Sequence, residues 1–178
     1  PSMRYIIGKR MQMNRKIKYK LIAIDALIAL TLLFLDQFTK HLVTVRLKNQ
    51  PPFVLIDGVL EFQYFENTGI AFSLFQGRKA FILATGFLVM AVILFFLFRI
   101  PEDRKFRIVH VLMAVLIAGA LGNIIDRIRF DYVVDFIYFV LINFPIFNVA
   151  DCYIVVSAIV LFFLFLFVYK EQDLAFLS

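Results

Sequence analysis

Four apolar stretches, each long enough to cross a lipid bilayer, constrain the fold of this 178-residue chain more than any other feature. They run roughly from Tyr19 to Leu35, Ala80 to Phe98, Ile108 to Ile125 and Val149 to Tyr169. Each contains about 17–21 residues, close to the 20 or so that a spanning helix needs. Hydrophobic residues make up 62% of the chain, against about 45–50% in soluble domains. The sequence therefore excludes a soluble globular protein and predicts an all-α membrane protein with a bundle of four transmembrane helices.

The distribution of Lys and Arg predicts how these helices are oriented. Seven basic residues precede or begin the first stretch, and four lie in the short connection 99–107. The two longer connections, 36–79 and 126–148, contain seven between them. Because basic residues concentrate in cytoplasmic loops, we expect both termini to be cytoplasmic and both long connections to face outward. This placement of the +6 net charge beside membrane segments also argues against a nucleic-acid partner.

We expect a single membrane-embedded domain over residues 19–170, because the sequence shows no internal repeat and no low-complexity linker. Residues 1–18 form a basic cytoplasmic tail in this prediction, and residues 171–178 form a second, short one. Pro1 cannot be an initiator residue, so we expect the first residues to include an expression scar and assign them no role in the fold.

The first outward connection carries the pattern of a small extracytoplasmic β-sheet over about residues 53–75. Residues 54–56 and 59–65 are β-prone and flank Asp57-Gly58, which predicts a hairpin with a type I′ turn. A second turn at residues 67–69 precedes a short predicted strand, Ile70–Leu74. The second outward connection is expected to be an outer loop. The apolar side chains expected to lie against lipid or helix ends are Phe53, Leu60, Phe62, Phe65, Phe72 and Phe75.

Charged and amide side chains are few near the predicted spans, and most gather at the outer ends. Such groups are costly to bury in a membrane, so each is a candidate for function. They are Asp36 and Lys40 after the first stretch, Asn67 in the turn, Asn123, Asp126 and Arg127 after the third stretch, Asp135 in the outer loop, and Asn148 and Asp151 at the start of the fourth stretch. Gly69, in the same turn as Asn67, is a further candidate.

For several of these residues a purely structural interpretation stays open. Asp36 and Lys40 are spaced i,i+4 and can form a solvated ion pair at a helix end. Asn67 and Gly69 suit an ordinary turn, because both tolerate left-handed backbone angles. From spacing alone, turn chemistry is the better interpretation of these two.

For the candidates beside the third and fourth stretches, both a structural and a functional interpretation stay open. Asn123, Asp126 and Arg127 share one helical face. Asp126 and Arg127 can neutralise each other, or the guanidinium can reach a substrate carbonyl. Asn148 is suited to cap the fourth helix, with Asp151 as a first-turn acid favoured by the helix dipole.

Other polar residues have simpler interpretations. Asp25 lies toward the cytoplasmic side and is expected to be structural, and Asp131 is expected to be solvated. Cys152, the only cysteine, is expected to be a buried inert thiol. His41 and His110 fall on opposite sides, and no metal, phosphate-loop or serine-nucleophile motif is present. We therefore expect no metal and no cofactor.

Asp135 and Asp151 together suggest a chemistry. Asp135 lies between apolar neighbours, where a solvated surface charge is hard to explain. Two carboxyl groups held together away from water cannot both ionise cheaply, so one keeps a proton. The ionised group can then take a proton from water while the protonated one donates to a peptide carbonyl. The helix N-terminus favours Asp151 as the anion and Asp135 as the acid.

Over about residues 20–170 the chain resembles bacterial lipoprotein signal peptidase, also called signal peptidase II. Five motifs carry the resemblance, in the order expected for the family. They are Asp36-Gln37-x-x-Lys40, Asn67-Thr68-Gly69-x-Ala71-Phe72, Gly122-Asn123-x-x-Asp126-Arg127, Val133-x-Asp135-Phe136-Ile137 and Phe147-Asn148-x-Ala150-Asp151. The family usually has Gly where this chain has Asp131, which leaves the conformation of that turn open.

The resemblance implies an aspartic endopeptidase of the bacterial inner membrane, active near its outer face and without a cofactor. Its substrates are prolipoproteins, cut just before a cysteine that carries diacylglycerol. The implied partners also include membrane lipids and a cyclic peptide antibiotic such as globomycin, and a monomer is expected. Asp135 and Asp151 take the catalytic positions. Residues implied to support them or to bind substrate are Asp36, Lys40, Asn67, Gly69, Asn123, Asp126, Arg127 and Asn148.

Two other functions fit four helices with acidic residues. A small proton-coupled transporter would place its ionisable groups near mid-membrane and often shows a repeat, whereas here they gather at one face. A lipid-binding or scaffold protein would need no chemistry, and its aspartates would only cap and pair helices.

Overall fold

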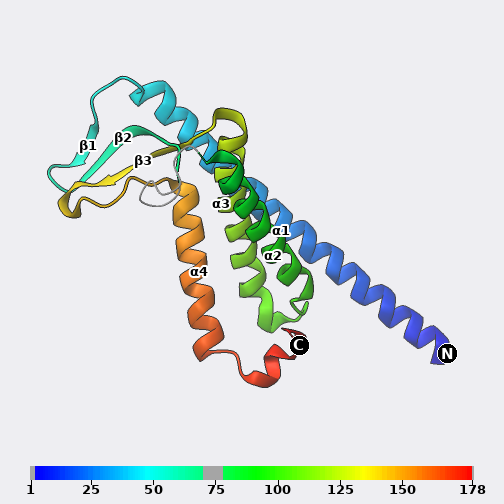
Figure 1. Ribbon diagram of the computed structural model, residues 1–178. Coiled ribbons are helices and arrows are strands. Elements are labelled where there is room, and N and C mark those ends of the chain that lie inside the picture. The colour runs from blue at the N-terminus through cyan, green and yellow to red at the C-terminus, as the bar shows by residue number, and fades with distance from the viewer. Residues whose placement is uncertain (1–2, 70–77, 178) are drawn as a thin grey trace.

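The computed structural model describes residues 3–69 and 78–177, with side chains for residues 18–69 and 78–174. This part of the chain forms four α-helices and a small antiparallel sheet (Figure 1). The helices are α1 (Met3–Leu47), α2 (Lys79–Arg99), α3 (Arg107–Phe130) and α4 (Val149–Phe167). Each contains a segment long and apolar enough to cross a membrane. The predicted fold, a four-helix membrane bundle with a small sheet, is confirmed.

Two helices run further than the apolar stretches predicted. We expected the first span to end at Leu35 and the third at Ile125, but α1 continues to Leu47 and α3 to Phe130. Asp36, Lys40 and Asp126, which follow these two stretches, face another helix rather than water. Once charges pair across two helices, neither helix has to end where they occur.

Helix α3 is the centre of the bundle. Half of its most apolar segment is buried, against about a sixth in each of the other three helices. Two glycines let its neighbours approach closely. A Cβ on Gly119 would lie 2.6 Å from the carbonyl oxygen of Ala150 in α4, and one on Gly122 would lie 2.4 Å from Oδ2 of Asp36 in α1. The outer faces of the helices expose large apolar side chains, as a lipid environment requires.

The sheet has strand order β1-β2-β3, with β1 (Phe53–Ile56), β2 (Leu60–Asn67) and β3 (Val133–Phe139). The hairpin between β1 and β2 was predicted, but its type I′ turn is wrong. Such a turn needs positive φ at both central residues, and only Gly58 has it, with φ +66°. The predicted strand Ile70–Leu74 lies outside the described residues, as do Phe72 and Phe75. Strand β3, which comes from the predicted outer loop, was not expected from the sequence.

One face of the sheet packs against the end of α1, so the sheet is fixed to the bundle. Val134 and Phe136 of β3 cluster with Val43, and Phe62 and Leu47 pack around them. Figure 1 shows the sheet at one end of the bundle and both ends of the chain at the opposite end. The other face of the sheet borders a cavity.

A buried polar contact lies toward the opposite end of α1 and α3. Asp25 Oδ2 and His110 Nδ1 are 2.9 Å apart, and each residue is only 6% exposed. This contact, called the distal pair below, fits the structural role predicted for Asp25.

Candidate active site

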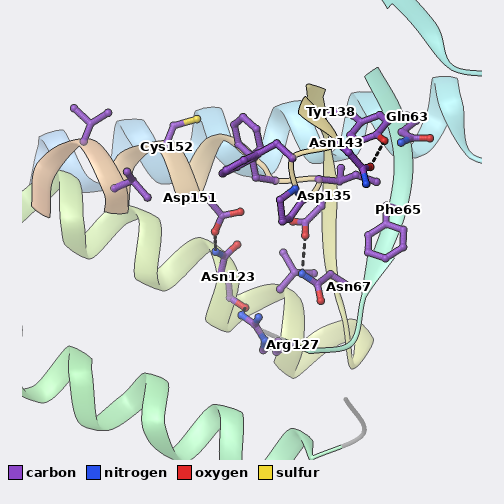
Figure 2. A pocket seen from close by; sticks show the side chains of 17 residues that line it. Gln63, Phe65, Asn67, Asn123, Arg127, Asp135, Tyr138, Asn143, Asp151 and Cys152 are labelled. Atoms are coloured by element: carbon purple, nitrogen blue, oxygen red, sulfur yellow. Dashed lines mark hydrogen bonds between the residues drawn. The ribbon is translucent and has the colours of Figure 1, made fainter. Parts of the chain in front are cut away.

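A cavity of about 1010 Å³ lies between the sheet, the ends of α3 and α4 near it, and the loop that follows β3. Five of the predicted site residues line it together: Asn67, Asn123, Arg127, Asp135 and Asp151. Figure 2 shows these side chains converging on it from both strands and both helices. Residues spread over 85 positions of the sequence thus form one site.

Asp135 from β3 and Asp151 from α4 both point into this cavity (Figure 2). Asp135 is 1% exposed. Its Oδ2 accepts a hydrogen bond from Asn67 Nδ2 at 2.8 Å, and its Oδ1 accepts one from Asn148 Nδ2 at 2.6 Å. Asp151 Oδ1 accepts a hydrogen bond from Asn123 Nδ2 at 2.8 Å. Three amide side chains therefore fix the orientation of the two carboxyl groups.

Asn148 connects the two aspartates directly. It is the N-cap of α4, where its Oδ1 accepts from the backbone N–H of Asp151 at 3.0 Å. Asp151 Oδ2 in turn accepts from the backbone N–H of Asn148, also at 3.0 Å, which completes a capping box. The predicted cap is confirmed. Because the Asn148 amide also donates to Asp135, the cap links the start of α4 to β3.

Burial, and after it the nearby charge of Asp151, raise the pKa of Asp135 from its ordinary value of 3.8 to about 7. The hydrogen bonds from Asn67 and Asn148 act in the opposite direction but are outweighed. A carboxyl group with this pKa can hold a proton near neutral pH and still release it, which suits general acid chemistry.

A buried ionic cluster lies behind the cavity. Lys40 Nζ lies 2.9 Å from Asp36 Oδ2, 2.9 Å from Asp126 Oδ2 and 3.0 Å from Asn123 Oδ1. Asp36 is 0% exposed and Lys40 3%. The alternative of a solvated ion pair at a helix end is therefore wrong. These four residues, Asp36, Lys40, Asn123 and Asp126, are called the site cluster below.

The site cluster also holds the backbone of the two elements that carry the aspartates. Asp36 Oδ1 accepts from the N–H of Ala150, in the first turn of α4, at 3.0 Å. Asp126 Oδ2 accepts from the N–H of Val134, beside Asp135, at 3.4 Å. Lys40 bonds the oxygen of the Asn123 amide, so the NH₂ of that amide faces Asp151. The cluster thus positions both carboxyl groups without lining the cavity itself, apart from Asn123.

Arg127 contacts the turn after β2 and does not pair with Asp126, so the alternative of mutual neutralisation is wrong. Its Nη2 donates to the carbonyl oxygen of Gly69 at 2.8 Å. Gly69 N–H donates to Asn67 Oδ1 at 3.0 Å, as the predicted turn chemistry requires. Arg127 Nε is buried and has no hydrogen-bond partner among the described residues.

Some residues at the site were missed by the sequence analysis. Gln37 Nε2 donates to Asp126 Oδ1 at 2.8 Å, but only its position next to Asp36 pointed to it. Gln63, Tyr138 and Asn143 also line the cavity. Gln63, Phe65 and Asn67 are spaced two residues apart in the sequence, and in a regular strand this spacing would predict that all three lie on one face.

A family model described as "Signal peptidase (SPase) II" matches residues 28–167. The chain belongs to the signal peptidase II family. It is 39% identical over 135 residues to the lipoprotein signal peptidase of Caldanaerobacter subterraneus, covering 75% of this chain and 90% of that protein. It is 40% identical over 137 residues to that of Microcystis aeruginosa, covering 76% and 86%.

A solved structure described as a bacterial membrane enzyme has the same fold. It superimposes with a TM-score of 0.73 at 28% identity, covering 84% of this chain and 93% of that chain. This member of the signal peptidase II family is therefore a peptidase and a multi-pass membrane protein.

Asp131, where the resemblance implies a glycine, has a conformational explanation. Asp131 ends α3 with φ +70°, in the left-handed region that Gly enters most readily. Asp is among the few other residues that tolerate it. Its side chain is exposed, as predicted, and pairs with Lys79. The turn therefore keeps the backbone conformation that a glycine would favour.

Proposed function

We propose that the chain is an aspartic endopeptidase that removes the signal peptide from prolipoproteins, cutting before the diacylglyceryl-modified cysteine. The observation that carries this proposal is the convergence of Asp135 and Asp151 on one cavity, with Asn148 bonded to both. The names of the relatives, lipoprotein signal peptidase, support the substrate class.

In the proposed mechanism the two carboxyl groups share one proton. Asp135, whose pKa is about 7, holds it, and Asp151 is ionised. Asp151 removes a proton from a water molecule, whose oxygen attacks the scissile carbonyl carbon, while Asp135 gives its proton to the carbonyl oxygen. In the second step Asp151 returns its proton to the amide nitrogen and Asp135 regains one from a hydroxyl of the tetrahedral intermediate. The C–N bond then breaks.

The cavity suits a lipid-anchored substrate. On α4, next to Asp151, the cavity is lined by Cys152, Val155 and Val156. These side chains form a mostly apolar surface along a membrane helix. We propose that the substrate's apolar part approaches along this surface, so the scissile bond meets the aspartates where α4 begins. We propose that the sheet lies at the outer face of the bacterial inner membrane, with both termini in the cytoplasm, and the distribution of basic residues supports this orientation.

The test compares Asp135→Asn and Asp151→Asn with Asp131→Asn, an exposed aspartate that serves as matched control. Purified protein is assayed on a diacylglyceryl-modified precursor, and circular dichroism and thermal unfolding report whether each variant folds. Each dyad variant should fold and lose at least about a hundredfold in kcat, because acid–base groups contribute about 10²–10⁴-fold. The control should keep wild-type activity. A folded dyad variant that cleaves at the wild-type rate would overturn the assignment.

Two further arms test the substrate. An otherwise identical precursor without diacylglycerol should be cleaved poorly, and equal cleavage would refute recognition of the lipid. A cyclic peptide antibiotic such as globomycin should inhibit cleavage by competing for the cavity. Inhibition that is unaffected by precursor concentration would contradict that competition.

A further inference from the structure

The cavity extends well beyond the two aspartates. Gln63, Phe65 and Asn67 of β2 all line the cavity, although the pairing of β2 with β3 shifts register between Phe62 and Phe65. Asn67 is bonded to Asp135. Gln63 precedes Asn67 by four residues, which is roughly 13 Å along a strand at about 3.3 Å per residue. The sheet therefore offers a track that leads away from the aspartates.

Polar side chains gather at the far end of this track. Tyr138 OH donates to Asn143 Oδ1 at 2.7 Å. Figure 2 shows both residues beside Gln63, at the opposite end of the cavity from Arg127. The Gln63 side chain makes no hydrogen bond to the described residues. These three residues, Gln63, Tyr138 and Asn143, are called the polar rim below.

The loop that carries Asn143 is fixed to the sheet rather than hanging free. Phe147 exchanges two backbone hydrogen bonds with Ile137 of β3, at 2.8 and 3.1 Å. Asn143 itself adopts φ +48° after a short 3-10 turn at Val140–Ile142. The rim is therefore preformed, which lowers the entropy cost of binding a ligand there.

We propose that the polar rim binds the backbone of the extended segment that follows the modified cysteine in the precursor, an inference that rests on the proposed function. The rim lies on the sheet and on the loop that follows β3. The sheet lies beyond the helix ends, where the part of the precursor outside the membrane must pass (Figure 1). The membrane part of the precursor has its own surface on α4. Amide and phenol groups carry no charge at neutral pH, so they suit peptide N–H and C=O groups of any sequence.

The distance between Asn67 and Gln63 sets the number of precursor residues needed to reach the rim. An extended chain spans about 3.3–3.6 Å per residue, so roughly 13 Å corresponds to about four residues from the scissile bond. Precursors with one or two residues from the cysteine onward cannot reach the rim, and those with about five can.

The experiment uses lipidated precursors that share one signal peptide and end one, two, four or six residues after the scissile bond. With wild-type protein, kcat/KM should rise between two and six residues, by roughly three- to tenfold for each hydrogen bond gained, and the rise should appear in KM. In the double variant Gln63→Ala, Asn143→Ala, kcat/KM should be the same for all lengths. Gln172→Ala, an exposed glutamine outside the cavity, should keep the wild-type rise.

Failure of this proposal is distinguishable from failure of the proposed function. If no precursor is cleaved, the proposed function fails. If all lengths are cleaved with equal kcat/KM by wild type, or if the folded double variant keeps the rise, only the rim assignment fails. If the wild-type protein responds instead to changes before the cysteine and the double variant does not, the rim binds the signal peptide and the proposal is overturned. Thermal unfolding of each variant checks that it is folded.

Discussion

In the part of the chain whose side chains are described, two buried polar contacts join α1 to α3, and they differ in the elements to which they connect. The site cluster and the distal pair are both nearly inaccessible, and their α1 aspartates, Asp36 and Asp25, are eleven residues apart, or about 16 Å along the helix. The site cluster continues into β3, α4 and the cavity. The distal pair ends in His110 Nε2, which is buried and has no partner in the described residues.

This difference shows where buried charge serves chemistry and where it only joins helices. Replacing a whole buried ion pair by apolar residues is often neutral, whereas removing one partner is costly. The distal pair holds two residues and could in principle be replaced as a unit. The site cluster could not, because its oxygens accept backbone N–H groups beside both aspartates.

The largest expected effect is that of Lys40→Met in the site cluster. This substitution leaves the carboxylates of Asp36 and Asp126 buried without their shared cation. We expect a loss of about 3–5 kcal/mol in the free energy of unfolding and loss of cleavage, because the Asn123 amide is no longer held toward Asp151. Chemical unfolding in detergent and the precursor assay measure the two effects.

Lys48→Met is the matched control for this prediction. Lys48 lies just beyond the end of α1 and pairs with Glu66 at 2.9 Å, but both side chains are about 40% exposed. An exposed pair contributes about 0–1 kcal/mol, so stability should change little. Equal losses in Lys40→Met and Lys48→Met would show that the site cluster has no special role.

The pH dependence of the site comes next in size. The pKa of Asp135 is about 7 in the folded protein and has an ordinary value of 3.8. Folding therefore favours its protonated form, so its contribution to stability is full below about pH 4 and is lost as the pH rises through 7. Cleavage should also fall above about pH 7, as the shared proton is lost.

Asp135→Asn isolates this effect, because the amide cannot ionise. The melting temperature of wild type should fall between pH 5 and pH 8.5 by more than that of the variant. Parallel pH profiles for the two proteins would show that Asp135 does not titrate in this range.

The same contrast explains what could be predicted from the sequence. Hydropathy placed all four spans, and the cost of burial singled out Asp36, Asp126 and Asp135. Hydropathy did not predict how far α1 and α3 continue. A hydropathy value counts the cost of moving a single charged side chain out of water, and it takes no account of a partner on another helix. Strand β3 was missed because residues on both of its faces are buried over Val133–Phe136. The sequence there shows no alternation of polar and apolar residues.

A smaller effect is expected at the distal pair. Asp25→Val alone leaves His110 buried with neither ring nitrogen paired and should destabilise the protein by about 1–3 kcal/mol. The double variant Asp25→Val, His110→Leu should recover most of that loss, because two apolar side chains need no partner. Cleavage should stay at the wild-type level in the double variant. A double variant that is less stable than the single one, or inactive, would show that the distal pair, like the site cluster, cannot be replaced as a unit.

The smallest expected effect is that of Asp131→Gly, away from both buried contacts. Glycine enters the left-handed region without steric cost, which favours the folded state, but it also gives the unfolded chain more freedom. The exposed pair with Lys79 is lost as well, at little cost. We therefore expect the free energy of unfolding to change by no more than about 1 kcal/mol, with cleavage unchanged. A larger loss of stability in Asp131→Gly but not in Lys79→Gln would mean that the Asp131 side chain itself supports the turn into β3. An exposed polar group would then contribute as much stability as the distal pair.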